Sequence, residues 1–118
     1  MWTEKQNREA ETEIGRVTIG GNPTAVETRG EIRNLPVYGP GGYFWTPRQG
    51  DRVLVIKGGP GGEEQCVVAT EQQKMDLEQG DIALRSAGAS LVLRADGRIE
   101  LRGKLWINGN PVGNLGIG

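Results

Sequence analysis

The sequence predicts an all-β protein, with a small barrel or sandwich first and a run of very short strands in its last third. Twenty of its 118 residues are glycine, and they gather in pairs and clusters between apolar runs. Such clusters are typical of the turns that join many short strands. The apolar runs alternate with the period of two expected of strands, and no segment carries a convincing helical stripe.

Composition and charge exclude several classes of protein. The chain has 36% hydrophobic and 25% charged residues, as in an ordinary globular domain. No run approaches the roughly 18 apolar residues of a transmembrane helix, and the first residues lack the apolar stretch of a secretion signal. The net charge of −1 argues against a main task of binding nucleic acid, which usually needs a basic excess.

The reactive side chains do not predict catalysis or metal binding. The chain has no histidine, and its single cysteine, Cys66, has the setting of a small apolar residue in a strand. Asp51, Glu63 and Glu64 are the candidate acid–base carboxylates, but no histidine or paired nucleophile accompanies them. The two glutamates at the end of 58–64 also argue against a phosphate-binding loop. We expect no enzymatic activity, no catalytic residue, no metal and no cofactor.

The first part of the chain is expected to hold an arm and a barrel. Residues 1–13 are polar and resemble a loose N-terminal arm. Residues 14–72 are expected to form the barrel, because strand-like runs follow one another between turn residues. The candidate strands are 14–19, 24–32, 35–39, 52–58 and 63–72.

The amino-acid composition changes at residues 73–80, which are expected to link the barrel to residues 81–118. Four short phrases follow, and their first apolar positions are 82, 91, 99 and 105. Residues one and three of each phrase share a face, because side chains alternate along a strand. Asp96–Gly97 and Asn108–Gly109 are hairpin-turn dipeptides between the phrases. The predicted meander has one wholly apolar face: Ile82, Leu84, Leu91, Leu93, Ile99, Leu101, Leu105 and Ile107.

A single layer of such strands is unstable in water while its apolar face is bare. The face packs either on the N-terminal barrel or against copies of itself. The barrel region has apolar residues of its own to fill a small interior, including Val17, Val26 and Val55. The eight positions of the meander also form an unbroken repeat, as in stacked structures whose layers cover one another. Both features favour self-association, although periodicity does not reveal the number of copies.

The order of these motifs resembles the bacteriophage baseplate assembly protein V family. Members of this family are the central spikes of contractile phage tails and are related to the spike of type VI secretion systems. The resemblance runs from about residue 14 to the C-terminus. PRQGDRVLVIKGG, which contains Pro47, Gly50 and Asp51, is similar to a strand of the family's OB-fold. IALRS, LVLRADG, IELRG and LWING are similar to its β-helical shaft.

This resemblance implies an all-β homotrimer with an OB-fold-like collar and an intertwined, trimeric β-helical or β-prism shaft. The eight apolar residues would form the shared core of the shaft, and Arg85, Arg94, Glu100 and Arg102 would lie outside it. The collar would bind the baseplate hub protein. The spike would cap the tail tube and help to puncture the host envelope, which it contacts transiently, and no nucleic acid partner is expected.

The resemblance further implies a virion protein of the tail baseplate, made in the bacterial host cytoplasm without a signal peptide. Many family spikes end in a tip that holds an iron ion between histidines, but this chain has no histidine and is expected to lack that site. Its end, NPVGNLGIG, is expected to be a plain apolar end of the shaft, or a separate protein forms the tip. A lysozyme-like domain, which some relatives carry, is not expected, and the shaft is short for crossing a membrane alone.

Tyr43, Phe44 and Trp45 form a second candidate site in a chain that is otherwise poor in aromatic residues. With Arg48 nearby, they are suited to stack the bases of single-stranded nucleic acid on an OB-fold. The acidic balance of the chain instead favours packing at the barrel mouth, or a contact with a subunit or partner. The alternative function is therefore an OB-fold binding module for single-stranded nucleic acid or a protein partner, which trimerises through its C-terminal repeats.

Overall fold

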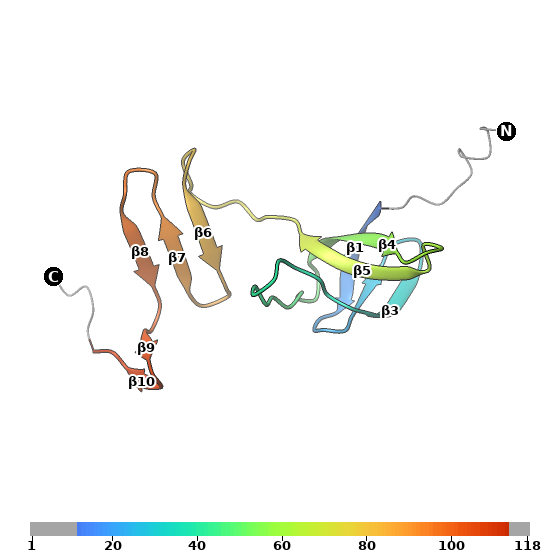
Figure 1. The fold of residues 1–118 in the computed structure, drawn as a ribbon, viewed down its shortest axis with the longest axis horizontal. Helices are drawn as coiled ribbons and strands as arrows, with labels where there is room; N and C mark the ends of the chain where they lie inside the picture. The colour runs from blue at the N-terminus through green and yellow to red at the C-terminus, as the bar shows by residue number, and fades with distance from the viewer. Residues whose placement is uncertain (1–11, 114–118) are drawn as a thin grey trace. The chain divides into compact units, whose positions relative to one another are not determined.

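The computed structural model describes residues 12–113. The chain divides into two compact units, and the boundary in the sequence lies between Gln73 and Lys74. Both units consist of antiparallel strands, and the described range contains no helix (Figure 1). The predicted all-β class is therefore confirmed. The N-terminal arm expected over residues 1–13 lies outside the described residues, except for Thr12 and Glu13, which belong to the first strand.

The first unit contains a five-stranded antiparallel sheet with the strand order β3-β2-β1-β4-β5. Of the five strands expected in this region, three correspond to strands of the sheet: those over residues 14–19, 52–58 and 63–72. The inner faces of the strands are rich in valine, whose β-branched side chain suits a half-buried pleated surface. The strands are β1 (Thr12–Ile19), β2 (Thr24–Glu27), β3 (Glu31–Leu35), β4 (Arg52–Gly58) and β5 (Glu64–Thr70).

The single strand predicted over residues 24–32 is wrong, because the chain reverses inside this stretch. β2 and β3 form an antiparallel hairpin in which Glu27 pairs with Glu31. In the loop between them, the N–H of Thr28 donates to the carbonyl of Gly30 at 3.1 Å. The weak alternation of this stretch has a physical reason, since its polar residues occupy a turn instead of one face of a strand.

The strand expected over residues 35–39 is mostly irregular. Beyond the end of β3, a single parallel bridge joins Val37 to Val67 of β5. The N–H of Tyr38 donates to the Val67 carbonyl at 2.8 Å, and the N–H of Val67 donates to the Pro36 carbonyl at 3.0 Å. Pro36 has no N–H of its own, so a regular ladder does not continue through it. These bonds bring the chain after β3 against β5, the strand at the other edge of the sheet.

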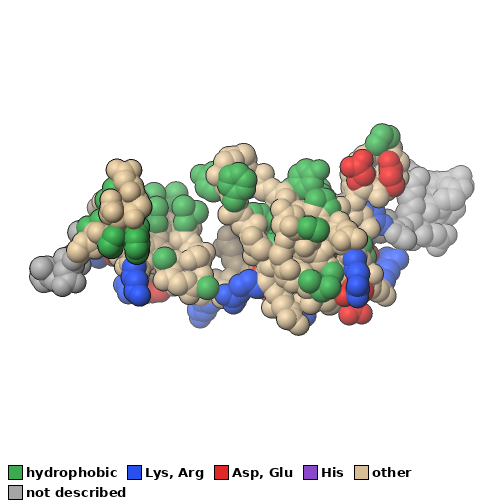
Figure 2. All heavy atoms as spheres, turned by 90° about the horizontal axis from the view of Figure 1, so that it is seen from below, with side chains coloured by type: hydrophobic (Ala, Val, Ile, Leu, Met, Phe, Trp, Pro, Cys, Tyr) green, Lys and Arg blue, Asp and Glu red, His purple; other side chains and the backbone are tan. Residues whose placement is uncertain are grey.

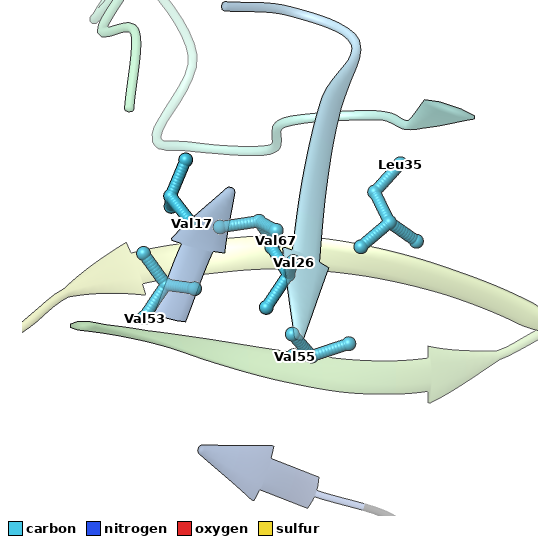
Figure 3. Close-up of a cluster of buried hydrophobic side chains, with 6 residues drawn as sticks. All are labelled: Val17, Val26, Leu35, Val53, Val55 and Val67. Atoms are coloured by element: carbon cyan, nitrogen blue, oxygen red, sulfur yellow. The ribbon is translucent and has the colours of Figure 1, made fainter. Parts of the chain in front are cut away.

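The core of the first unit draws one or two side chains from every strand. In Figure 3 these side chains converge between the ribbons of the sheet. None of them is more than 3% exposed, so all six side chains are shielded from solvent. The six residues are Val17, Val26, Leu35, Val53, Val55 and Val67.

The second unit contains a three-stranded antiparallel sheet and a short hairpin. Strands β6 (Ile82–Arg85), β7 (Ser90–Leu93) and β8 (Ile99–Arg102) lie side by side in chain order (Figure 1). Strands β9 (Trp106–Ile107) and β10 (Asn110–Pro111) pair with each other. Three of the four predicted phrases therefore share one sheet, and the fourth lies in the separate hairpin.

The two predicted turn dipeptides both lie in hairpin loops. Asn108 and Gly109 have φ angles of 52° and 79°, the left-handed pair that a two-residue type I′ turn requires. Gly97 has a φ of 100°, but its loop is one residue longer than predicted. There the N–H of Arg94 donates to the Arg98 carbonyl at 2.8 Å, which leaves three residues in the loop.

Candidate assembly surfaces

The register of the second unit aligns six of the eight predicted apolar residues on one face. Each residue of β7 pairs with one residue of β6 and one of β8, so the side chains form rows across the sheet. Side chains two residues apart on a strand share a face, so both rows lie on the same side. We term these rows the apolar face: Ile82–Leu93–Ile99 and Leu84–Leu91–Leu101.

The apolar face is open in the single chain. Ile99 is 70% exposed and Ile82 61%, the two highest values for aliphatic side chains in residues 12–113. Apolar side chains are visible at the surface of both units in Figure 2. Single exposed apolar residues are ordinary, but two adjoining rows of them on one sheet mark an interaction surface.

The other two predicted core residues lie outside this sheet. Leu105 is half-buried just before β9, and its carbonyl accepts a hydrogen bond from the N–H of Val112 at 2.8 Å. Ile107 is in the hairpin and is 54% exposed, next to Trp106, which is 59% exposed. The structure thus brings six of the eight residues together and leaves two on the hairpin.

The opposite face of the same sheet is partly covered. Val92 is only 2% exposed, whereas its neighbour on β7, Leu93, is 40% exposed and points to the other side. Val92 lies between Ala83 and Glu100 in the cross-strand register. The row through Val92 is therefore buried or half-buried within its own chain, whereas Arg85 and Arg102, farther along the same face, are exposed and polar, so apolar side chains lie open only on the apolar face.

A charged network lies on the covered side. The Asp81 carboxylate is 2% exposed and accepts hydrogen bonds from the Arg94 guanidinium at 2.9 Å and from the N–H groups of Glu78 and Ala95 at 2.9 and 2.7 Å. Arg94 also pairs with Glu100 at 3.1 Å. The two N–H donors, and then Arg94, hold the pKa of Asp81 below its usual range. Glu100, and then Asp81, raise the pKa of Arg94.

This network attaches the expected linker to the second unit. Arg94 donates to the backbone carbonyl of Asp76 at 3.0 Å, so the segment just before β6 is bonded to the loop after β7. Arg94 and Glu100, which the family resemblance places outside the shaft, are paired with each other within one chain. The sequence gives no signal for this network, because its members follow no period and come from separate segments.

The three predicted aromatic residues have different environments. Phe44 is 97% exposed and Tyr43 61%. Trp45 is half-buried, packs against the core of the first unit, and donates its indole N–H to the Tyr38 carbonyl at 3.0 Å. Trp45 thus anchors the loop to the core of the first unit. Tyr38, which the sequence did not single out, is a further exposed ring at 56%.

We term residues 38–45 the aromatic loop. Its first residue is hydrogen-bonded to β5, and the N–H of Tyr43 donates to the Pro40 carbonyl at 3.0 Å, which closes a turn inside the loop. Gly42 adopts the left-handed region there, with a φ of 89°. The whole stretch 34–47 contains no charged side chain. The loop is thus a fixed, uncharged projection that carries exposed rings.

Asp51 and Cys66 have structural environments, and the other two candidate carboxylates, Glu63 and Glu64, are exposed. Asp51 accepts the N–H of Arg48 at 2.9 Å within the turn before β4. Burial raises the pKa of the Cys66 thiol, which keeps it neutral. Residues 12–113 contain no group of three or more possible acidic, cysteine or histidine metal ligands, and no helix in this range is long and apolar enough to cross a membrane.

No family model matches the chain, and no curated protein matches it either.

Proposed function

We propose that this protein is the homotrimeric central spike of a contractile phage tail or of a phage-tail-like particle. The observation that carries the proposal is the open apolar face of β6, β7 and β8, in a sheet whose other face carries the buried Val92 and charged or polar side chains. A sheet needs a second layer to be stable in water. Copies of the chain that pack their apolar faces together supply that layer to one another.

The free energy that burial of the apolar face contributes is comparable with the cost of association. Full burial of one leucine or isoleucine side chain contributes about 1.5–3 kcal/mol. Six such residues in each copy, most of them about half exposed in the single chain, contribute on the order of 5–9 kcal/mol, which is of the same order as an association cost of about 4–15 kcal/mol. The resemblance of the repeats to a spike shaft sets the number of copies at three, with three sheets around one axis.

In this proposal the first unit is an OB-fold-like collar. The five-stranded sheet and the bridge from Val37 to Val67 are in keeping with a small barrel. The collar binds the tail hub protein, and the shaft points toward the host envelope, with or without a separate tip protein. Sheath contraction supplies the force, so the spike has a mechanical task and needs no catalytic residue.

The native mass tests this function first. We expect light scattering after size exclusion to give three times the chain mass of 12.7 kDa, about 38 kDa. The mass should stay constant over a hundredfold dilution, since an apolar core of this size binds tightly. A mass of one chain at every concentration would overturn the spike, because the apolar face would then need no partner copy.

The exposed aromatic rings support one alternative function, a module that binds single-stranded nucleic acid by stacking these rings on its bases. Phosphate contacts supply most non-specific affinity for nucleic acid, yet residues 34–47 contain no lysine or arginine. We therefore expect no binding of a fluorescent oligonucleotide at moderate salt. Binding that disappears in a Tyr43→Ser, Phe44→Ser variant would replace the spike by this alternative.

A further inference from the structure

A second apolar surface lies on the outside of the first unit. On β4, Val53 and Val55 point into the core, so Leu54 points outward. Leu54 pairs with Ile14 on β1 and with Ala69 on β5, which gives an apolar row across three strands. Ile14 is 55% and Leu54 38% exposed. This row has no role in the core or in the apolar face of the second unit.

The apolar surface extends from this cross-strand row along β4. Ile56 is two residues beyond Leu54, so it lies on the same face, and it is partly buried. These four side chains carry no charge, and we term them the outer strip: Ile14, Leu54, Ile56 and Ala69.

The aromatic loop does not cover the outer strip of its own unit. Phe44 is 97% exposed and so makes almost no contact within the chain, and Ile14 on the strip is more than half exposed. The loop is nevertheless held in place at its base by Trp45 and by the hydrogen bond of Tyr38 to β5. Each first unit therefore presents a projecting apolar group and a separate apolar surface, both without a partner in the described residues.

Two different complementary surfaces on each copy are what a ring requires. In a cyclic trimer every contact is heterologous, since one patch of each copy meets another patch of the next. The aromatic loop and the outer strip match in chemistry, because both are uncharged and apolar. Neither nucleic acid nor an anionic lipid surface fits the loop as well, because both favour cations and residues 34–47 have none.

We propose that the aromatic loop of one copy packs on the outer strip of the neighbouring copy, which closes the three first units into a ring. This inference rests on the proposed homotrimer. Association of the shafts brings the first units to a high effective concentration, so a modest contact at each loop is enough to order the ring. Phe44 is the central contact of the loop, and Leu54 is the central contact of the strip.

Cross-linking tests the contact directly in the full chain. Phe44→Cys and Leu54→Cys are combined in a Cys66→Ala background, and the native protein is treated with a short bismaleimide. We expect covalent dimers and trimers on a denaturing gel, because each copy links to the next around the ring. Each single cysteine variant, and Phe44→Cys combined with Glu27→Cys on the exposed side of β2, should give no ladder.

The outcomes separate this contact from the spike itself. A native trimer that forms no Phe44–Leu54 cross-link would overturn the ring while leaving the spike standing. A trimer in which Phe44→Cys alone cross-links would also overturn it, since the loops would then meet one another. A native mass of one chain would overturn both proposals. A mixture of the two single variants should give cross-linked dimers and thereby exclude a link within one chain.

Discussion

Gly15 is the glycine with the least room for a side chain among the described residues of the first unit. A Cβ at this position would overlap the Val26 side chain and approach the Glu27 carbonyl oxygen to 2.8 Å. Val26 is fully buried in the core, so neither neighbour is free to move away. Only glycine lets β2 lie this close to β1, which explains why a glycine interrupts the apolar alternation of a central strand.

We therefore predict that Gly15→Val lowers the free energy of unfolding of the first unit by about 1–3 kcal/mol, the usual cost of overpacking a core. Urea denaturation measures the change. Gly30→Val is the matched control, because a Cβ there meets nothing within 4 Å and its effect should be small. Equal stability of the Gly15 and Gly30 variants would show that β2 does not pack on Gly15.

Asp81 is the residue that binds the segment before β6 to the sheet. Two backbone N–H groups and Arg94 favour its charged form, so its pKa is lower in the folded state than in the unfolded chain. A lowered pKa gives stability that is complete above the unfolded value of about 3.9 and is lost as the pH falls through the lower folded value. The contribution of Asp81 is thus present at neutral pH and absent in strong acid.

Asp81→Asn should accordingly destabilise the second unit at pH 7, and the difference from the unsubstituted protein should shrink below about pH 4. Urea denaturation over a pH series measures both effects. Asp76→Asn is the control, because Asp76 is exposed and its contact with Arg94 uses the backbone carbonyl, which the substitution keeps. A difference that is equally large at pH 7 and pH 2 would mean that the charge of Asp81 is not what matters.

At the scale of elements, the sequence predicts repeated short-range patterns and misses contacts between distant segments. The three strands β6, β7 and β8 were predictable because their apolar residues alternate and glycine turns separate them. The network of Asp81, Arg94 and Glu100 was not predictable, since it depends on register between strands. The hairpin of β2 and β3 was also missed, because its loop residues resemble the polar side of a strand.

The side chains that β8 contributes to the apolar face give the clearest test of whether this face joins the copies. Leu101→Asp should abolish the oligomer, because it places one carboxylate from each copy in a dry core. Arg102→Asp on the same strand points to the opposite face and should leave the oligomer intact. Light scattering after size exclusion measures both masses. An intact oligomer with Leu101→Asp would show that another surface joins the copies.

At the scale of the whole molecule, the hydrogen-bond pairing within one chain bears on how the copies of the proposed trimer would associate. β6, β7 and β8 are consecutive in the chain and pair with one another within one copy. The sheet is therefore complete in its backbone bonds between adjacent strands before any second copy arrives. An intertwined shaft, as the family resemblance implies, requires strands of different copies to alternate, and these intrachain pairs would have to break.

We predict that the assembly forms by packing of preformed sheets and that its copies exchange without unfolding. Trimers labelled with ¹⁵N, when mixed with unlabelled trimers in native buffer, should yield mixed trimers, as followed by native mass spectrometry. Their rate of appearance should depend only weakly on urea at low concentration, because little surface beyond the apolar face is exposed in the exchange. Interleaved strands would instead exchange only through global unfolding, so the rate would rise steeply with urea and match the unfolding rate.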